Sequence, residues 1–319
     1  MMRRRSLGLL AATTLAAPFA ARAAWPERPV TVVVPYPPGG NNDILARLLA
    51  PVVEREIGQP LVIDNRGGGG GTIGAGQAAR ATPDGHTVLF ADIGILAIAP
   101  HLFASLPFGP DSFAPVIRLT EVSLLLGVPR ESPYRSVADL IAAARARPEA
   151  LNFGTPGPGT AGHLAAQMLL SLTGTRMTHV PFRGSAPAAQ ELVAGRIDLL
   201  IDGTLLPAVQ QGSIRALAVT GGTRSPFTPD LPTVGEAGVP GYAFASWHGV
   251  VAPRGTPAEA IARLNAAFNA ALRDATVQAR ARQLGLPLTG GTAADFATWI
   301  VAERAKFGPL VQASGARVE

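Results

Sequence analysis

Residues 30–43 read Val-Thr-Val-Val-Val-Pro-Tyr-Pro-Pro-Gly-Gly-Asn-Asn-Asp, and this stretch joins two structural patterns. Its first five residues are all β-branched, which predicts a buried strand that ends at Pro35. Over residues 42–57, apolar side chains recur at helical spacing, although Pro51 predicts a kink or an early stop. A strand that leads directly into a helix is the building unit of α/β folds.

Strand and helix patterns alternate through most of the remaining chain. Strands are predicted at 61–63, 86–91, 177–181, 197–201 and 214–219, and as a pair within 115–128 separated near Glu121. Helices are predicted at 161–172 and 185–194, and after capping-box sequences that begin at Ser136, Thr256 and Thr292. This alternation predicts parallel sheets covered by helices. Because no Ser/Gly-rich linker divides the chain, two lobes would be joined through strands.

The loop between the first strand and the first helix has the chemistry of an anion site. Gly39 and Gly40 have no side chains, so a ligand can approach their backbone closely. The N–H groups at the start of the following helix lack partners within the helix and carry partial positive charge, which suits an anion. The alternative is an ordinary tight turn capped by Asn41 or Asn42.

A second loop of the same kind spans residues 153–163. Thr155 and Thr160 add hydroxyl donors, and Gly157 and Gly159 open the backbone between them. If the two loops belong to opposing lobes, they can hold one carboxylate from both sides. The alternative is a second capped turn. His163 lies one helical turn beyond the loop, where it either lines the cleft or makes a structural hydrogen bond.

A glycine-rich segment supports a rival interpretation. Gly69, Gly71 and Gly74 match G-x-G-x-x-G between a predicted strand and a helix, and Asp92 follows about 20 residues later, as in dinucleotide-binding folds. This pattern would suit an exported oxidoreductase. However, five consecutive glycines make the match easy to obtain by chance. The P-loop, G-x-S-x-G and H-E-x-x-H motifs are absent, and the histidines lack metal-ligand spacing. We therefore expect no enzyme, no cofactor and no metal site.

The N-terminus predicts export. Three arginines at 3–5, an apolar run over 7–21 and the small-x-small sequence Ala21-Arg22-Ala23 form a signal peptide, residues 1–23, cleaved after Ala23 by either the general or the twin-arginine route. Removing its four arginines lowers the formal charge of +5 to +1, which argues against nucleic-acid binding. The chain has no cysteine, so disulfides, thiol catalysis and a lipid-anchored cysteine are excluded. We expect a monomeric periplasmic protein.

From Trp25 to the C-terminus, ordered landmarks resemble the periplasmic receptors of the tripartite tricarboxylate transporter family, also called Bug proteins. The landmarks include Pro38-Gly39-Gly40, Asn65-Arg66, Pro83-Asp84-Gly85, Gly159-Thr160, Val180-Pro181-Phe182-Arg183-Gly184 and Gly195-Arg196-Ile197-Asp198. The resemblance implies a type II-like periplasmic binding protein fold, with the ligand cleft between two lobes joined by crossing strands. Lobe I would comprise 24–124 plus 249–319, and lobe II 125–248.

The same resemblance implies what the protein does and where. It implies capture of a small organic acid, a carboxylate, for delivery to the membrane components of a tripartite tricarboxylate transporter or to a sensor. Family loops that hold the carboxylate, partly through water, correspond to Pro38, Gly39 and Gly40 and to Thr155, Gly159 and Thr160. We further expect Tyr36 to cover an apolar part of the ligand or to lie in the core. Asp202 is expected to meet a second polar group or to make a structural hydrogen bond.

The predicted binding site therefore draws on both loops and on one strand end. Its residues are Tyr36, Pro38, Gly39, Gly40, Asn41, Thr155, Gly157, Gly159, Thr160, His163 and Asp202. Asn41 stands where family members often carry a small hydroxyl residue. The identity of the carboxylate is left open between di- or tricarboxylates, aromatic acids and amino acids.

Overall fold

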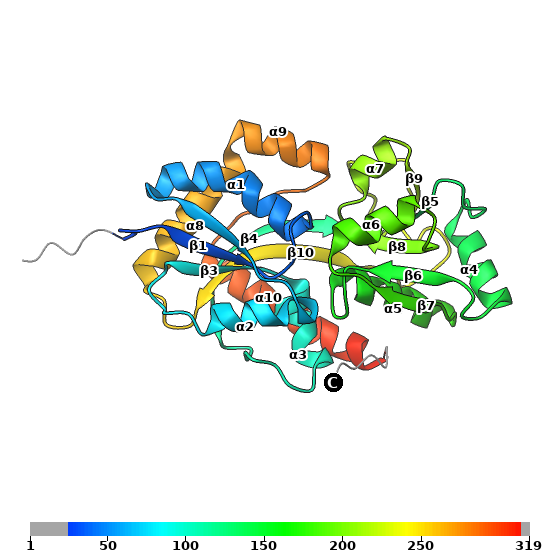
Figure 1. The fold of residues 1–319 in the computed structure, drawn as a ribbon, viewed down its shortest axis with the longest axis horizontal. Helices are drawn as coiled ribbons and strands as arrows, with labels where there is room; N and C mark the ends of the chain where they lie inside the picture. The colour runs from blue at the N-terminus through cyan, green and yellow to red at the C-terminus, as the bar shows by residue number, and fades with distance from the viewer. Residues whose placement is uncertain (1–24, 314–319) are drawn as a thin grey trace, which may run out of the picture.

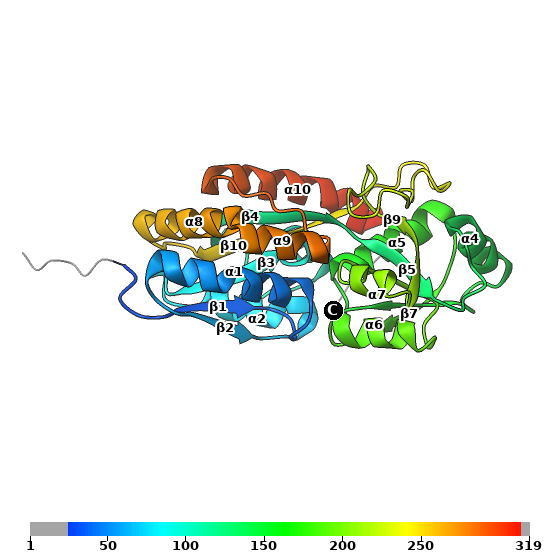
Figure 2. The same cartoon turned by 90° about the horizontal axis from the view of Figure 1, so that it is seen from above.

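The computed structural model describes residues 25–313, which form two α/β lobes side by side (Figures 1 and 2). In this part of the chain, one five-stranded sheet has the strand order β2-β1-β3-β10-β4, and the other has the order β7-β6-β8-β5-β9. Helices pack on the faces of both sheets, and the chain passes between the lobes through strands (Figure 1). The predicted two-lobe fold is confirmed. The predicted signal peptide, residues 1–23, lies outside the described residues.

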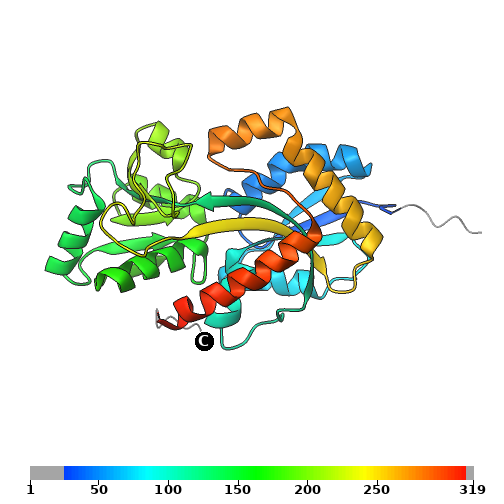
Figure 3. The same cartoon turned by 180° about the vertical axis from the view of Figure 1, so that it is seen from behind.

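The elements of the first lobe come from both ends of the chain. Its strands are β1 (Val30–Val34), β2 (Leu61–Asn65), β3 (Thr87–Asp92), β4 (Phe113–Ser123) and β10 (Ala245–Pro253). Its helical segments are α1 (Asn41–Ile57), η1 (Gly69–Gly71), α2 (Thr72–Ala79), η2 (Gly94–Ile98), α3 (Ala99–Leu102), α8 (Ala258–Arg273), α9 (Ala275–Leu284) and α10 (Ala293–Ala313). Figure 3, which shows the molecule from behind, has α10 in front of this sheet, with its C-terminal end beside the second lobe.

The second lobe is built from the middle of the chain. Its strands are β5 (Leu125–Pro129), β6 (Asn152–Thr155), β7 (Thr178–Pro181), β8 (Leu199–Asp202) and β9 (Ile214–Val219). Its helices are α4 (Val137–Ala146), α5 (Ala161–Thr173), α6 (Ser185–Val193) and α7 (Leu206–Gln210). The chain passes from the first sheet to the second at Leu124, and it returns to the first sheet between β9 and β10. The lobe limits given above, 24–124 plus 249–319 and 125–248, remain a prediction.

Both sheets are mixed, so the expectation of parallel sheets is correct for only part of each sheet. Strands β1, β2 and β3 are parallel, as are β6, β7 and β8, but β10 and β5 run antiparallel to their neighbours. The reason is the double crossing, because β5 enters the second lobe and β10 returns to the first. A strand that enters a lobe from the cleft must run away from the cleft. The parallel strands therefore end at the cleft, and the helices that follow them begin there.

Three local predictions differ from the structure. Helix α1 continues through Pro51 and ends at Gly58, which adopts the left-handed conformation. The break between β4 and β5 falls at Leu124. The expected capping box at Thr256 is not formed, because Pro257 occupies the N-cap position and the Thr256 hydroxyl donates to the Pro253 carbonyl. The other two boxes are present at Ser136 and Thr292, where each hydroxyl accepts from the backbone N–H three residues on.

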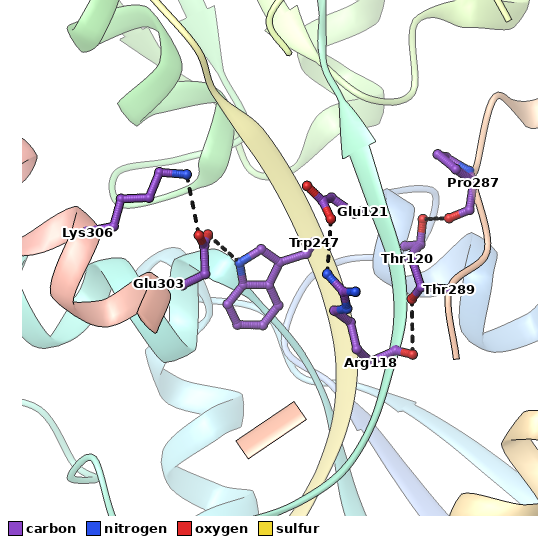
Figure 4. A network of polar contacts seen from close by, with 8 residues as sticks. All are labelled: Arg118, Thr120, Glu121, Trp247, Pro287, Thr289, Glu303 and Lys306. Atoms are coloured by element: carbon purple, nitrogen blue, oxygen red, sulfur yellow. Dashed lines mark hydrogen bonds and ion pairs between the residues drawn. The ribbon is translucent and has the colours of Figure 1, made fainter. Parts of the chain in front are cut away.

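The crossing strands β4 and β10 are anchored in the first lobe on either side (Figure 4). Trp247 is fully buried, and its indole Nε1–H donates to Glu303 Oε2 on α10 over 2.9 Å. On the other side, the Thr120 hydroxyl donates to the Pro287 carbonyl, and the Thr289 hydroxyl donates to the Arg118 carbonyl. These bonds fix the strand pair against α10 and the segment before it.

Candidate functional site

A small cavity lies between the lobes, where the parallel strands end. Its volume is about 60 Å³, which is room for a few water molecules or one small polar group. Both lobes line it, and Leu124, Ser246 and His248 of the crossing region line it as well. The residues at which the chain crosses from one lobe to the other thus form part of the wall of the cavity.

The start of α1 contributes from the first lobe. Gly40 is the N-cap, no side chain caps the helix, and Gly40, Asn41 and Asn42 line the cavity. Gly39 has a positive φ of 89°, and a Cβ atom there would lie 3.4 Å from the Ala186 Cβ of the second lobe. Gly39 therefore lies where the two lobes meet, and its positive φ, more than a lack of space, is what favours glycine there.

The start of α5 faces α1 from the second lobe. Thr160 is the N-cap, but its hydroxyl donates to the Gly157 carbonyl (2.8 Å) and leaves the helix N–H groups uncapped by a side chain. Thr160, Ala161 and Gly162 line the cavity. Glycine is required at 162 because a Cβ atom there would overlap the Ile201 carbonyl oxygen of β8.

Helix α6 supplies a third start, which the sequence analysis missed as a site. Gly184 is its N-cap, again without a side-chain cap, and Gly184 and Ser185 line the cavity. The signal was available, since β7 is followed by Arg183-Gly184-Ser185 just as β1 is followed by a glycine and a helix. The hydroxyl of Ser185 donates to Asp202 Oδ2 over 2.9 Å.

These three helix starts, at 40–42, 160–162 and 184–185, give the cavity its electrostatic character. Each helix N-terminus carries roughly half a positive charge and presents N–H groups that lack partners within the helix. Among the described residues, no lysine or arginine side chain lines the cavity. Positive potential in the cavity therefore comes from backbone dipoles, and this arrangement suits a carboxylate.

Two aspartates also reach the cavity, one from each lobe. Asp92 ends β3, and burial raises the pKa of its carboxyl to about 6, despite hydrogen bonds to Oδ1 from the Tyr36 hydroxyl (3.2 Å) and the Ile95 N–H (3.1 Å). Asp202 ends β8, and burial likewise raises its pKa, although Oδ1 accepts from the N–H and the hydroxyl of Thr204. Both acids therefore hold their protons more tightly than exposed carboxyls do.

His248 of β10 completes the wall beside Asp92, its register partner on β3. The ring is 3% exposed, and its Nδ1 has no hydrogen-bond partner among the described residues. Burial lowers the pKa of His248 to about 4, so the imidazole is neutral at neutral pH. From the sequence, this histidine was expected only not to bind a metal, and its connection with the cavity was missed.

Of the predicted site residues, Tyr36, Gly40, Asn41, Thr160 and Asp202 line this cavity together. The others lie elsewhere. Thr155 is fully buried behind the loop, where its hydroxyl lies 2.7 Å from His179 Nε2.

His163 also lies behind the loop. Its Nδ1 accepts from the Gly159 N–H over 3.3 Å, and its ring stacks on His179 with centroids 4.5 Å apart. Burial lowers the pKa of His163 to about 4, so the ring is neutral and acts as an acceptor for the loop. The structure thus places Thr155, Gly159 and His163 as supports of the second loop.

Pro38 and Gly157 line an outer groove together with the glycine-rich segment, residues 67–71, and this groove adjoins the cavity at Tyr36, Pro37, Pro156 and Gly184. A Cβ atom on Gly70 would overlap the carbonyl oxygen of Pro158, so this segment meets the second loop across the lobes. The glycines that suggested a dinucleotide site are therefore in contact with the opposite lobe. Within residues 25–313, no group of three His, Cys, Asp or Glu side chains is arranged for a metal ion, and no helix has the length and apolarity to cross a membrane.

Known proteins resemble this chain over most of its length. The sequence profile described as "Tripartite tricarboxylate transporter family receptor" matches residues 45–316. Protein BugT of Bordetella pertussis is 33% identical, with 98% of this chain and 97% of BugT covered. A structure of an R. palustris protein with adipate is 40% identical, with a TM-score of 0.89, covering 92% of this chain and 100% of that chain. MatC from Rhodopseudomonas palustris with bound malate is 35% identical, with a TM-score of 0.87 and coverages of 90% and 100%.

Proposed function

This chain belongs to the tripartite tricarboxylate transporter receptor family, and from that premise we propose that it captures a small carboxylate between its lobes. The family resemblance drawn from the sequence is confirmed. Receptors of this family are solute-binding proteins of the periplasm, and two similar structures hold adipate and malate. We extend this to an exported monomer that delivers its ligand to the membrane components of a transporter or to a sensor.

The convergence of three helix starts on one cavity carries the proposal. A micromolar ligand requires about −8 kcal/mol of binding free energy. A hydrogen bond to a charged group contributes roughly 1.5–3 kcal/mol net, so four or five backbone N–H donors are sufficient after ordering costs. A buried arginine would add an expensive desolvation step, and this cavity is built without one.

We assign different roles to the predicted residues. Gly40, Asn41 and Thr160 would surround the carboxylate directly, and Gly39, with its positive φ, would shape the turn that leads into α1. Thr155, Gly157, Gly159 and His163 would hold the second loop in shape, while Pro38 would form the rim. Tyr36 would contact the ligand and orient Asp92 through its hydroxyl. Asp202 would orient Ser185 at the third helix start.

The dinucleotide-binding alternative has less support. Gly69 and Gly71 flank Gly70, where an added Cβ atom would overlap the Pro158 carbonyl oxygen of the opposite lobe, and Gly74 lies inside α2 against the Arg66 carbonyl. The solute-binding family also favours a receptor. Bound nucleotide in the purified protein would reverse this preference.

The test is a binding screen of the chain without residues 1–23. We expect thermal-shift assays against a panel of organic acids to show stabilisation by a small carboxylate, about 2.7 kcal/mol when the ligand is at 100 times its dissociation constant. Gly40→Asp should weaken binding at least about 100-fold, because its carboxylate would face the ligand in a water-poor cavity. The fold should persist, since aspartate is a favoured N-cap residue.

Gly40→Ala is the matched control. Gly40 has a φ of −85°, and a Cβ atom there would make an ordinary 3.8 Å contact with the Ser185 hydroxyl. Alanine should therefore keep affinity within about threefold of the wild type, because it leaves the helix N–H groups free. Equal binding by the aspartate and alanine variants would remove the start of α1 from the site.

A further inference from the structure

The two aspartates of the cavity occupy equivalent positions in the two lobes. Each is the last residue of the central strand of its sheet, Asp92 on β3 and Asp202 on β8. In each lobe the neighbouring strand, β1 or β6, leads to a helix start at the same cavity. The first lobe thus contributes one positive helix end and one acid, and the second lobe contributes two helix ends and one acid. The cavity therefore suits a ligand that carries a hydrogen-bond donor in addition to a negative group.

The surroundings of Asp92 differ from those of Asp202. Asp202 is satisfied at both oxygens within its own lobe, by Ser185 at Oδ2 and by Thr204 at Oδ1. Asp92 accepts at Oδ1 from Tyr36 and Ile95, and hydrogen bonding by the Asn42 side chain and the Gly94 N–H also lowers the pKa of this carboxyl against the effect of burial. What distinguishes Asp92 from Asp202 is its neighbour, because Asp92 lies in register with His248 across the β3–β10 pairing.

His248 provides an independent indication of an unfilled polar position. It lies opposite Asp92 in the β3–β10 register and lines the same cavity. Its Nδ1 is buried and has no hydrogen-bond partner among residues 25–313. A buried polar atom without a partner is costly, and ligands or water usually satisfy such atoms. The wall formed by Asp92 and His248 is therefore suited to a ligand group that donates a hydrogen bond.

Charge matching favours the same conclusion. A ligand made only of carboxylates and methylene groups can satisfy the helix starts, but it brings a negative or apolar surface to Asp92. A hydroxyl or ammonium group satisfies Asp92, and ammonium also offsets its charge. Among the described residues that line the cavity, no lysine or arginine is present to neutralise Asp92.

We propose that Asp92 determines specificity by accepting a hydrogen bond from a hydroxyl or ammonium group of the ligand, so that hydroxy- or amino-carboxylates are preferred. His248 lies beside this group and contacts it as a neutral imidazole. The inference rests on the proposed carboxylate-receptor function and adds the substrate class. Adipate, present in one related structure, carries no such group and is therefore a useful comparison.

The experiment compares ligands that differ in one group. Isothermal titration calorimetry at pH 7.5 would use succinate, malate and aspartate, and the longer pair adipate and 2-aminoadipate. In at least one series the hydroxyl- or ammonium-bearing member should bind at least about tenfold more tightly, the factor that one hydrogen bond to a charged group contributes. Asp92→Asn should reduce this preference to less than about threefold while leaving the unsubstituted acid bound as before or more tightly.

Asp202→Asn is the matched comparison, since it changes the equivalent acid of the other lobe. It should retain the preference for the substituted ligand. The inference is overturned if unsubstituted acids bind as tightly as their hydroxy and amino counterparts, or if Asp92→Asn leaves the preference unchanged. In both cases the carboxylate-receptor function would stand. Failure of every acid in the panel to bind would instead contradict the proposed function, and the inference with it.

Discussion

At the scale of single residues, burial controls the charge of the cavity. Asp92 is 7% exposed, and its raised pKa means that the folded protein binds this proton more tightly than the unfolded chain does. The protonated carboxyl therefore contributes stability that is fully present below about pH 4 and is lost as the pH rises through about 6. His248 and Tyr36 face Asp92 and are neutral at neutral pH.

This linkage predicts the effect of Asp92→Asn on pH-dependent stability. The free energy of unfolding of the wild type, relative to the variant, should fall by up to about 3 kcal/mol between pH 4 and pH 7, since a shift of about two units corresponds to that amount. Urea denaturation of the ligand-free protein at several pH values measures the difference. Parallel curves for the two proteins would show that Asp92 titrates as an exposed carboxyl.

The residues that sequence could identify are those whose role follows from the local chain. Gly40, Asn41 and Thr160 stand at strand-to-helix junctions, where the pattern itself predicts N–H groups without partners, and all three line the cavity. Asp92 and His248 could not be assigned in this way. They meet through the β3–β10 pairing, which joins segments more than 150 residues apart in the sequence, 92 and 248.

At the scale of elements, the glycine-rich segment before α2 determines how closely the lobes approach. Gly70 adopts φ 64° and ψ 22°, and its missing side chain leaves room for the Pro158 carbonyl of the opposite lobe. The G-x-G-x-x-G match offered a cofactor loop here as a rival interpretation, because a sequence pattern shows a flexible backbone but not what packs against it.

Gly70→Ala should therefore impair closure. We expect ligand affinity to fall at least about tenfold, because a Cβ atom cannot share the position of the Pro158 oxygen without separating the lobes. Gly174→Ala is the control, since Gly174 has almost the same conformation (φ 62°, ψ 28°) and no atom within 4 Å of an added Cβ. Both variants carry the same backbone strain, so equal affinities would exclude a role for the contact.

The anchoring of β10 on α10 gives a prediction about stability. Trp247→Phe removes the hydrogen bond to the buried Glu303 and leaves a small void, which should cost about 2–4 kcal/mol of unfolding free energy. Trp299→Phe should cost less, because Trp299 Nε1 has no hydrogen-bond partner within the described part of the chain. Denaturant titrations measure both, and equal losses would show that the bond to Glu303 is not what anchors the strand.

Element types were largely predictable, whereas strand directions were not. The capping boxes at Ser136 and Thr292 depend on neighbouring residues and were correctly read, while the one at Thr256 was overridden by Pro257. The antiparallel strands β5 and β10 depend on which lobe the chain is entering. Alternating strand and helix patterns contain no such information, so only the assembled fold reveals it.

At the scale of the whole molecule, the double crossing organises the binding site. It aims the C-terminal ends of the parallel strands of both lobes at one cleft, as the views from two sides show (Figures 1 and 2). The helix starts and the aspartates at the strand ends thus lie together at the cleft, although they are far apart in the sequence. The proposed capture would therefore couple ligand binding to closure, because contacts from both lobes are complete only when the lobes are together.

The most direct test of this account is a crystal structure of the chain with its preferred carboxylate. We predict that the carboxylate oxygens lie within hydrogen-bond distance, directly or through one water, of backbone N–H groups at the starts of both α1 and α5. A ligand held in the outer groove by the Arg183 side chain, or one that contacts a single lobe, would contradict the central claim.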